Sequence, residues 1–229
     1  MKLHRYYLPN IELTHDLWID NQVLFHQWTR VLRYEVGREV ELFNDKLEDR
    51  IYKILKIGDN AVHLELVTQL EPNVPKRDLY LCFSLLKKDK VEWVLQKGTE
   101  LGVRHFIPLL TDRTEKTGFD IERAEKIVIE ASEQCGRSDI PRVREPMKLE
   151  TAIDELQKEV TLYVAEQGSP EYLDITLKPS SIAVLVGPEG GWSESENQLF
   201  KDKELKYIAL SKFTLRAETA SIAAVTLLQ

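Results

Sequence analysis

The stretch AVLVGPEGGWSESE, residues 183–196, decides how the chain is interpreted. An apolar run of strand character ends at a loop with three glycines and one acid, and a helix start follows. Glycine-rich turns between a strand and a helix often bind phosphate, because the free N–H groups at a helix start attract anions. This loop matches neither GxGxxG nor GxxxxGK, so neither kind of nucleotide site has direct support.

The side chains of this loop favour a ligand without phosphate. Ser193 and Glu196 have the spacing of a capping box, so the protein itself satisfies some of the N–H groups that an anion would need. Glu189 would add repulsion to a phosphate held nearby. A cationic or zwitterionic ligand held by main-chain groups fits this loop better than a phosphate. Alternatively, the loop binds no ligand and is a tight turn in which glycine allows a positive φ.

Composition is that of an ordinary globular chain. The 229 residues are 43% hydrophobic and 30% charged, with a net charge of −7. The first residues lack the apolar core of a signal peptide, and no run approaches the roughly 20 apolar residues of a membrane span. Cys82 and Cys135 lie far apart, and the histidines have no metal-ligand spacing. These features predict a cytoplasmic protein with reduced thiols, no membrane contact and no metal site.

The excess of acidic residues lies in the first and last thirds of the chain. The middle third could therefore present a local basic face, and a mixed solvated surface is the alternative.

The pattern of apolar residues changes at a proline-containing linker, residues 71–76. Before it, short alternating runs predict a small β-barrel or sandwich with one helix around residues 21–33. After it, strands alternate with helices, which predicts an α/β domain with a largely parallel sheet. We therefore expect two domains, residues 1–73 and 74–229. The expected strands are 38–43, 50–55, 61–67, 78–84, 103–109, 160–165, 182–186 and 207–210, and the expected later helices are 89–101, 120–135, 149–158, 193–201 and one from about 215.

Charged residues near two helix ends are further candidates. Arg216 precedes an almost wholly apolar helix, and a cation gains nothing at a helix N-terminus. A buried salt bridge, or a catalytic or substrate-anchoring role, would explain it. Glu218 in the first turn of that helix suits the helix dipole and has a purely structural explanation as well. Arg137 follows the 120–135 helix, where it suits the dipole or could grip a phosphate or a base.

Several stretches together resemble one family. They are HRYY (4–7), WTRVLRYEVGREVELFND (28–45), QKGTELGV (96–103), EASEQCGRSDIPRV (130–143), LVGPEGGWSESE (185–196) and LRAETA (215–220). In this order they resemble the RsmE family of ribosomal RNA methyltransferases, in the SPOUT (α/β-knot) superfamily. The chain departs from the family at Ser211, where glycine is usual, and at Phe213, where a basic residue is usual.

The resemblance implies an activity and an architecture. The activity is transfer of a methyl group from S-adenosylmethionine to N3 of a uridine in 16S rRNA of the small subunit, at position 1498 by convention. The architecture is an N-terminal PUA-like β-barrel that binds RNA, followed by an α/β trefoil-knot domain, in a homodimer. A non-catalytic RNA-binding module, a SPOUT methyltransferase acting on another RNA position, and a transferase or hydrolase that binds a nucleotide are the alternatives.

Carried over residue by residue, the resemblance also implies the site. Arg216 would stabilise negative charge on the uracil oxygens, and Glu218 or a water would accept the N3 proton. RNA would be held by Arg5, Arg30, Arg33 and Arg137. The implied cofactor-binding residues are Val164, Glu166, Val186, Gly187, Glu189, Gly190, Gly191, Leu210, Ser211, Leu215, Arg216 and Thr219.

Overall fold

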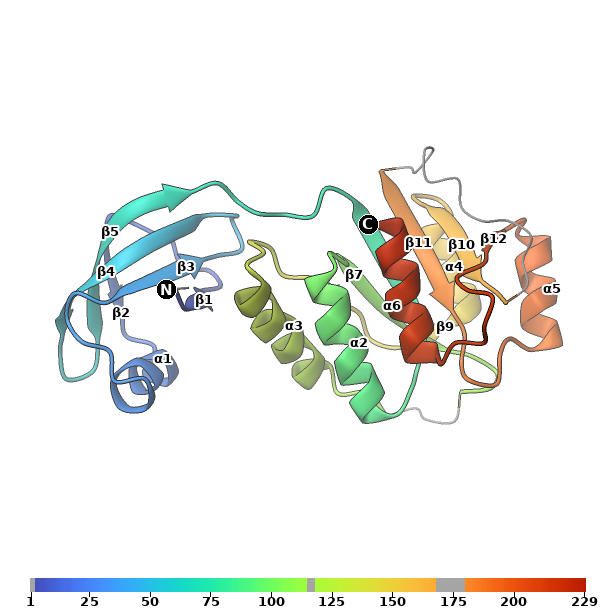
Figure 1. Ribbon diagram of the computed structural model, residues 1–229, viewed down its shortest axis with the longest axis horizontal. Coiled ribbons are helices and arrows are strands. Elements are labelled where there is room, and N and C mark those ends of the chain that lie inside the picture. Colours follow the sequence, from blue (N-terminus) through green and yellow to red (C-terminus); the bar gives the residue numbers. More distant parts are fainter. Residues whose placement is uncertain (1–2, 115–117, 168–179) are drawn as a thin grey trace. The chain divides into compact units, whose positions relative to one another are not determined.

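A computed structural model describes residues 3–114, 118–167 and 180–229. The chain divides into two compact units (Figure 1). The N-terminal unit holds the residues up to Val74 together with Ser132–Ile140, and the C-terminal unit holds Pro75–Ala131 and Pro141–Gln229. Within the described residues, no helix has the length and apolar character that crossing a membrane requires.

The N-terminal unit is built on a curled five-stranded sheet in the order β1-β3-β4-β5-β2. Alternating side chains cover a core in which Trp28, Tyr52 and Val40 are fully buried. All strand pairs are antiparallel except β1 with β3. The strands are β1 (Arg5–Tyr7), β2 (Asp16–Ile19), β3 (Glu39–Phe43), β4 (Asp49–Ile57) and β5 (Val62–Leu70).

The helix expected over residues 21–33 is shorter in the structure. Helix α1 (Gln22–His26) is capped by the Asn21 side chain and continues directly into a π-helical turn, η1 (Gln27–Val31). Arg33 adopts a left-handed backbone with a φ of 51°, so a right-handed helix cannot continue through it.

Residues 132–140 form part of the N-terminal unit, although the sequence places them in the second domain. Helix α3 (Ile121–Cys135) ends where Gly136 adopts a φ of 88°, as expected for a helix C-cap. Beyond it, Arg5 donates hydrogen bonds to the main-chain oxygens of Ser132 and Arg137, at 3.3 Å and 3.0 Å between the nitrogen and each oxygen. Ser138 donates to the Asp49 carboxylate at 2.6 Å. Long-range side-chain bonds of this kind leave no periodic trace in the sequence.

The C-terminal unit contains a seven-stranded sheet in the order β12-β10-β11-β6-β7-β8, with β9 also paired to β7. Its strand pairs are parallel. Its strands are β6 (Asp78–Ser84), β7 (His105–Leu110), β8 (Arg142–Val143), β9 (Met147–Lys148), β10 (Thr161–Ala165), β11 (Ser181–Val186) and β12 (Lys206–Ile208). With the curled N-terminal sheet, this parallel sheet confirms the predicted α/β fold class, and the trefoil threading stays a prediction.

Helices cover both faces of the parallel sheet. Tyr80 and Cys82 of β6 belong to a core with α4 (Leu149–Leu156) and with Phe200 of α5 (Glu194–Asp202). Side chains alternate along a strand, so Leu81 and Phe83 face the other way. On that side α6 (Ala217–Leu228) packs against β6, β11 and α2 (Lys88–Glu100) (Figure 1). The parallel strands therefore end at one sheet edge, between two helical layers.

Candidate functional site

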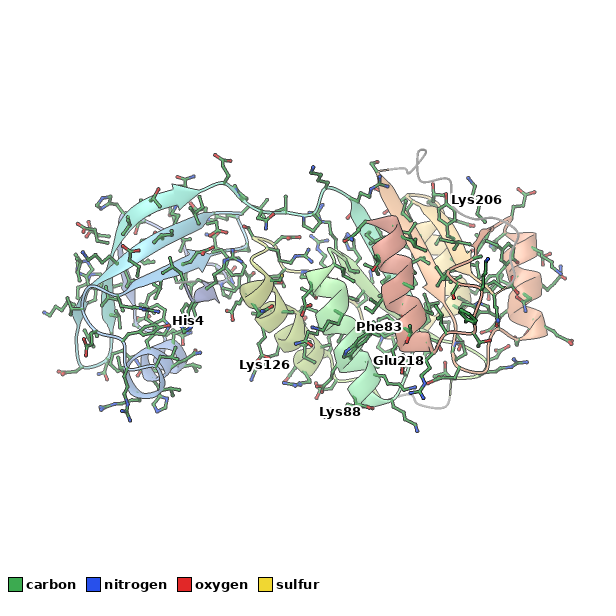
Figure 2. The ribbon with its side chains drawn as sticks, in the orientation of Figure 1. His4, Phe83, Lys88, Lys126, Lys206 and Glu218 are labelled. Atoms are coloured by element: carbon green, nitrogen blue, oxygen red, sulfur yellow. The ribbon has the colours of Figure 1, made fainter. Side chains whose placement is uncertain are left out.

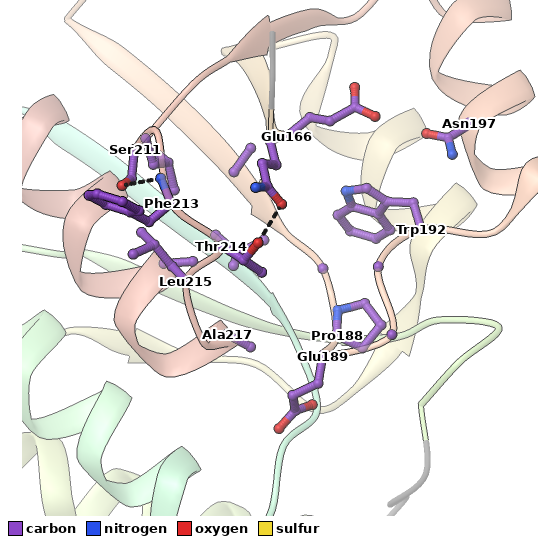
Figure 3. Close-up of a pocket in the computed structure, with 18 residues that line it drawn as sticks. Glu166, Pro188, Glu189, Trp192, Asn197, Ser211, Phe213, Thr214, Leu215 and Ala217 are labelled. Carbon is purple, nitrogen blue, oxygen red and sulfur yellow. Dashed lines mark hydrogen bonds between the residues drawn. The ribbon is translucent and has the colours of Figure 1, made fainter.

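A cavity of about 420 Å³ lies where β10, β11 and β12 end (Figure 3). The register places Val164 of β10 beside Leu185 of β11, and Ala165 beside Ile208 of β12, so the three carboxyl ends are level. Open parallel sheets bind ligands at this edge. The lining comes from the loops after the three strands and from two helices, and consists of residues 165–167, 186–192, 210, 211, 213–215 and 217 with Asn197 and Ala220.

The glycine loop allows the main chain to come close to a neighbouring ring. A Cβ on Gly187 would lie 2.9 Å from Cε2 of Trp192, closer than real side chains approach. The Trp192 indole is itself packed edge-on against Phe200, with 5.0 Å between the ring centroids. Gly191 has a φ of 69°, in the region that favours glycine. Gly187 is therefore required because a side chain would clash with Trp192, and Gly191 is favoured because of its positive φ.

The helix start after the loop is capped as predicted. The Ser193 side chain accepts a hydrogen bond from the Glu196 N–H at 3.1 Å, and the Glu196 carboxylate accepts from the Ser193 N–H at 2.7 Å. The same carboxylate also accepts from the Asp112 N–H at 2.9 Å. Glu196 therefore joins the loop after β7 to the loop after β11, and the helix start is already satisfied without an anion.

Two hydrogen bonds shape the opposite wall (Figure 3). Thr214 donates to the Gln167 side-chain oxygen at 2.9 Å between the two oxygens, which connects the loop after β12 to the loop after β10. The Ser211 hydroxyl accepts from the Phe213 N–H at 3.0 Å, which forms a local turn. Phe213 is 80% exposed, so this aromatic ring stands at the rim of the cavity with little of its surface covered.

The charge of the lining is acidic. Among the described residues that line the cavity there is no lysine, arginine or histidine, whereas Glu166 and Glu189 contribute carboxylates. A phosphate would find no cation here to neutralise it. The cavity therefore suits a neutral or positively charged group that is recognised by main-chain atoms.

Lys90 of α2 holds two carboxylates that flank the cavity. Its Nζ lies 2.7 Å from the Glu189 Oε1 and 3.3 Å from the Glu218 Oε2. The hydrogen bond to Lys90 is the main reason that the pKa of Glu189 lies below its ordinary value, and the same bond is the main reason that the pKa of Lys90 lies above its own. Both groups stay charged at neutral pH, so the ion pair holds Glu189, a residue of the cavity lining, in place.

Most of the predicted cofactor-binding residues line this cavity. The exceptions are Val164, Arg216 and Thr219. The Val164 side chain is fully buried in the core beneath the cavity. Arg216 and Thr219 are exposed, and Arg216 is the N-cap residue of α6. Glu218, labelled in the first turn of α6 in Figure 2, does not line the cavity. Its Oε2 lies 3.3 Å from the Lys90 Nζ instead.

The lining also contains residues that were not predicted as site residues. Trp192, Phe213 and Thr214 are among them, together with Gln167 and Asn197. Trp192 belongs to the recognised stretch 185–196, and Phe213 lies two residues before the recognised stretch 215–220, so proximity in sequence was an available signal. Lys90 gave no such signal, because its partner Glu189 is 99 residues away.

The predicted RNA-binding arginines fall into two groups. Arg30 and Arg33 are exposed on the N-terminal unit. Arg5 and Arg137 are only 6% and 5% exposed, and both are engaged by carboxylates. Arg5 pairs with Asp49 and Glu41, and Arg137 pairs with Asp139 at 2.8 Å between Nη2 and Oδ2. Arg5 and Arg137 therefore stabilise the protein through internal ion pairs. Arg30 and Arg33 are exposed and can contact a ligand.

Neither metal nor thiol chemistry is suggested by the described residues. They contain no group of three or more His, Cys, Asp or Glu side chains that could hold a metal ion. Cys82 and Cys135 are free thiols, and burial raises the pKa of Cys82 to about 12, so this thiol does not ionise at neutral pH.

Comparisons with known proteins agree on one family. Residues 73–229 match the family model of the RNA methyltransferase domain. The chain is 34% identical to ribosomal RNA small subunit methyltransferase E of Rickettsia conorii, over 98% of this chain and 94% of the relative. It is 32% identical to the protein of the same name from Aquifex aeolicus, over 87% of this chain and 88% of the relative.

Solved structures show the same likeness over nearly the whole chain. A putative methyltransferase from Legionella pneumophila in complex with its bound cofactor SAM superposes with a TM-score of 0.87 at 28% identity, over 100% of this chain and 98% of that one. Ribosomal RNA small subunit methyltransferase E from Neisseria gonorrhoeae, bound to S-adenosyl methionine, also gives 0.87 at 28% identity, over 98% of this chain and 95% of that one.

Proposed function

The chain belongs to the ribosomal RNA small subunit methyltransferase E family of RNA methyltransferases, and we propose that it methylates N3 of a uridine in 16S rRNA with S-adenosylmethionine as the methyl donor. The cavity at the carboxyl ends of β10, β11 and β12 is the cofactor site of this proposal. The substrate is the RNA of the small ribosomal subunit, in the cytoplasm.

The observation that carries the proposal is the acidic lining of the cavity, which disfavours a phosphate and suits a cation. S-adenosylmethionine supplies a methyl group on a positively charged sulfonium and has no phosphate. The described lining offers it the carboxylates of Glu166 and Glu189, of which Glu189 is also paired with Lys90 from outside the lining, and it contains no cation of its own. Gly187 and Gly191 carry no side chain, and an added Cβ at Gly191 would meet no atom within 4 Å, so main-chain groups of the turn can contact an adenosine directly.

The loops around the cavity position the donor rather than react with it. Methyl transfer is an in-line displacement, so holding the two reacting groups in the right geometry contributes much of the rate. The bond from Thr214 to Gln167 ties two walls of the cavity together, and the ion pair of Lys90 with Glu189 fixes the third. Ser211, where the family has glycine, keeps its N–H available and uses its hydroxyl for the local turn with Phe213.

Arg216 and Glu218 are the residues that we assign to the uridine. The N3 proton must leave before or during methyl transfer, and the uracil oxygens gain negative charge as it does so. Among the described residues the Arg216 side chain has no ion pair or hydrogen bond, so its charge is available to those oxygens. The buried Glu218 Oε2 accepts no hydrogen bond from a described residue and lies 3.3 Å from Lys90, so Glu218 is the nearby candidate for accepting the proton.

A substitution of Arg216 distinguishes a role in methyl transfer from a role in cofactor binding. Arg216→Ala should lower the rate of methyl transfer about 100-fold, the typical scale for removing one charge-stabilising donor, while the Kd for S-adenosylmethionine stays within twofold. Lys212→Ala, an exposed cation on the same loop, is the matched control and should keep the wild-type rate. Unchanged turnover in Arg216→Ala would remove Arg216 from the mechanism.

The target base is tested on the RNA itself. Small-subunit rRNA from a strain that lacks this gene should contain no N3-methyluridine at the target position, and the purified protein should restore it. Mass spectrometry of nuclease digests measures both. N3-methyluridine that persists in the deletion strain would contradict the proposed substrate.

The N-terminal unit is the RNA-binding part of this proposal. Arg30 and Arg33 are its exposed candidates for phosphate contacts, because they carry charge at the surface of η1 and of the turn that follows it. Arg30→Ala combined with Arg33→Ala should weaken binding to the small subunit about tenfold with the affinity for S-adenosylmethionine unchanged. The homodimer implied by the family resemblance belongs to the same proposal, and sedimentation equilibrium tests it.

A further inference from the structure

A second cavity lies directly beside the first, at the carboxyl end of β6. Strands β6 and β11 are parallel neighbours, so both cavities open at the same edge of the sheet. The second cavity, of about 460 Å³, begins where β6 gives way to α2, and Leu85 and Leu86 are buried beside it. It shares Pro188, Glu189 and Gly190 with the first cavity, so a single turn of main chain separates the two.

The charge of the second cavity is opposite to that of the first. Among the described residues of its lining, Lys87, Lys90 and Arg113 are cations and Glu189 is the one carboxylate. Glu189 is already paired with Lys90 at 2.7 Å, so one carboxylate stands against three cations and the described lining keeps a net positive charge. On a chain with a net charge of −7, such a local excess of positive charge marks a place for an anion.

The position of the two exposed cations suits an anion on the outer side of the glycine turn. Arg113 uses one Nη to donate to the Gly190 main-chain oxygen, which fixes the guanidinium at the turn and leaves further N–H groups for a ligand. Lys87 is the N-cap residue of α2 and makes no side-chain cap, so the positive end of a 13-residue helix faces the same region. Asp89 in the first turn offsets part of this helix field.

We propose that the cavity framed by Lys87 and Arg113 binds a phosphate group of the RNA substrate, next to the nucleotide whose base enters the cofactor cavity. The inference rests on the proposed function. The base and the phosphates of a nucleotide are attached to different carbons of the ribose, so a base presented to the first cavity brings a phosphate close to the second cavity. The glycine turn thus separates an acidic cofactor cavity from a basic phosphate cavity.

The carboxylate of the methyl donor shares the chemistry of a phosphate and is the other candidate anion. It would be supplied with the cofactor, whereas the RNA phosphate arrives with the substrate. The two sources are distinguished by which affinity responds when a cation is removed.

The test compares Lys87→Gln and Arg113→Gln with Lys88→Gln in the full-length protein. Lys88 is an exposed neighbour on α2 that does not line this cavity (Figure 2). Calorimetry gives the Kd for S-adenosylmethionine, and steady-state methylation of unmodified small subunits gives KM and kcat for the RNA. The salt dependence of binding to those subunits reports how many phosphates are contacted.

Lys87→Gln should raise KM for the small subunit about tenfold and lower the slope of log Kd against log salt concentration by about one. The Kd for S-adenosylmethionine should stay within twofold, which also shows that the variant is folded. Arg113→Gln should weaken RNA binding similarly, and Arg113→Lys should restore part of the loss because it keeps the charge.

Two results would overturn the phosphate site. A tenfold loss of S-adenosylmethionine affinity in Lys87→Gln would assign the cavity to the donor carboxylate. If Lys87→Gln and Lys88→Gln had the same KM for the small subunit and the same salt dependence of binding, Lys87 would contribute only general surface charge and no specific phosphate contact. Failure of the wild-type protein to methylate the subunit contradicts the proposed function instead, so the two failures are distinguishable.

Discussion

Arg5 and Asp49 form a buried ion pair in the N-terminal unit, with 2.6 Å between Nη2 and Oδ2 and each side chain 3% exposed. The same Asp49 oxygen accepts a hydrogen bond from Ser138 at 2.6 Å, and Arg5 also pairs with Glu41. Three separate parts of the chain therefore meet at one guanidinium. Its charge is committed inside the protein, so Arg5 has a structural role that its place in a basic N-terminal motif does not reveal.

The first prediction concerns the stability of this unit. Arg5→Met leaves Asp49 and Glu41 as buried carboxylates without their cation, which typically costs about 3–5 kcal/mol. Hydrogen exchange followed by mass spectrometry should show faster exchange in peptides from β3 and β4 of the full-length protein. Adding Asp49→Asn to Arg5→Met should cost less than the sum of the two single changes, because the second change removes a charge that the first left unpaired.

Arg30→Met is the matched control for Arg5→Met. Arg30 is an exposed arginine of the same unit, and its removal should change the free energy of unfolding by no more than about 0.5 kcal/mol. If Arg5→Met kept the hydrogen-exchange rates of the wild-type protein and lost only RNA affinity, the ion pair would not stabilise the unit. The assignment of Arg5 to RNA binding from the sequence would then hold.

Local pattern was sufficient to predict most elements of the C-terminal unit, but not the two-residue strands β8 and β9. The strand expected over 78–84 is β6 (Asp78–Ser84), and the helix expected over 120–135 is α3 (Ile121–Cys135). Strand β6 is a short continuous apolar run, α3 has apolar residues spaced by three and four, and glycine marks the end of α3. The helix expected over 21–33 was too long, because the sequence does not show the left-handed backbone of Arg33.

The candidate site could be predicted where its residues belong to a motif. The glycine loop and the loop after β12 are contiguous in sequence, and both line the cavity. Partnerships between distant charges could not be predicted, since sequence shows that a charge exists and not which charge it meets. Lys90 with Glu189, and Arg5 with Asp49, are of this kind.

The second prediction concerns Glu196, whose carboxylate bridges two loops beside the cavity. Glu196→Ala removes the acceptor of the Asp112 and Ser193 N–H groups, in a residue that is only 5% exposed. Leaving such groups without a partner costs about 1–3 kcal/mol. Scanning calorimetry should therefore show a Tm lower by roughly 2–4 °C for each kcal/mol lost.

Glu194→Ala is the control for the helix dipole alone. Glu194 lies in the same first turn of α5 but is exposed, so its removal should cost only a few tenths of a kcal/mol. Equal losses in the two variants would mean that charge at the helix start, and not the bridge to Asp112, sets the stability.

The third prediction concerns pH. His105 stacks on Tyr80 with 4.0 Å between ring centroids, and its Nε2 lies 2.9 Å from the Asp78 carboxylate. Burial lowers the pKa of His105 below its ordinary 6.5, although Asp78 opposes the shift. The unfolded chain therefore binds a proton before the folded chain does, and stability should fall as pH drops from about 6.5 toward the folded pKa.

Measuring Tm between pH 8 and pH 5, a range centred on about 6.5 where histidine titrates, tests this linkage. His105→Gln should have a weaker pH dependence than the wild-type protein, because the titrating ring is gone. His15→Gln removes an exposed histidine and should keep the wild-type dependence. Parallel curves for wild type and His105→Gln would show that other groups set the acid sensitivity.

The fourth prediction concerns the close contact inside the glycine turn. Gly187→Ala places a Cβ 2.9 Å from the Trp192 ring, which cannot retreat freely because it packs against Phe200. Moving the ring or the turn should cost about 1–3 kcal/mol and displace the wall of the cofactor cavity. Calorimetry should therefore show at least tenfold weaker S-adenosylmethionine binding. Gly118→Ala, where an added Cβ meets no atom within 4 Å, should bind normally. Normal binding by Gly187→Ala would mean that the turn can shift without reshaping the site, and that shape at Gly187 is not what positions the donor.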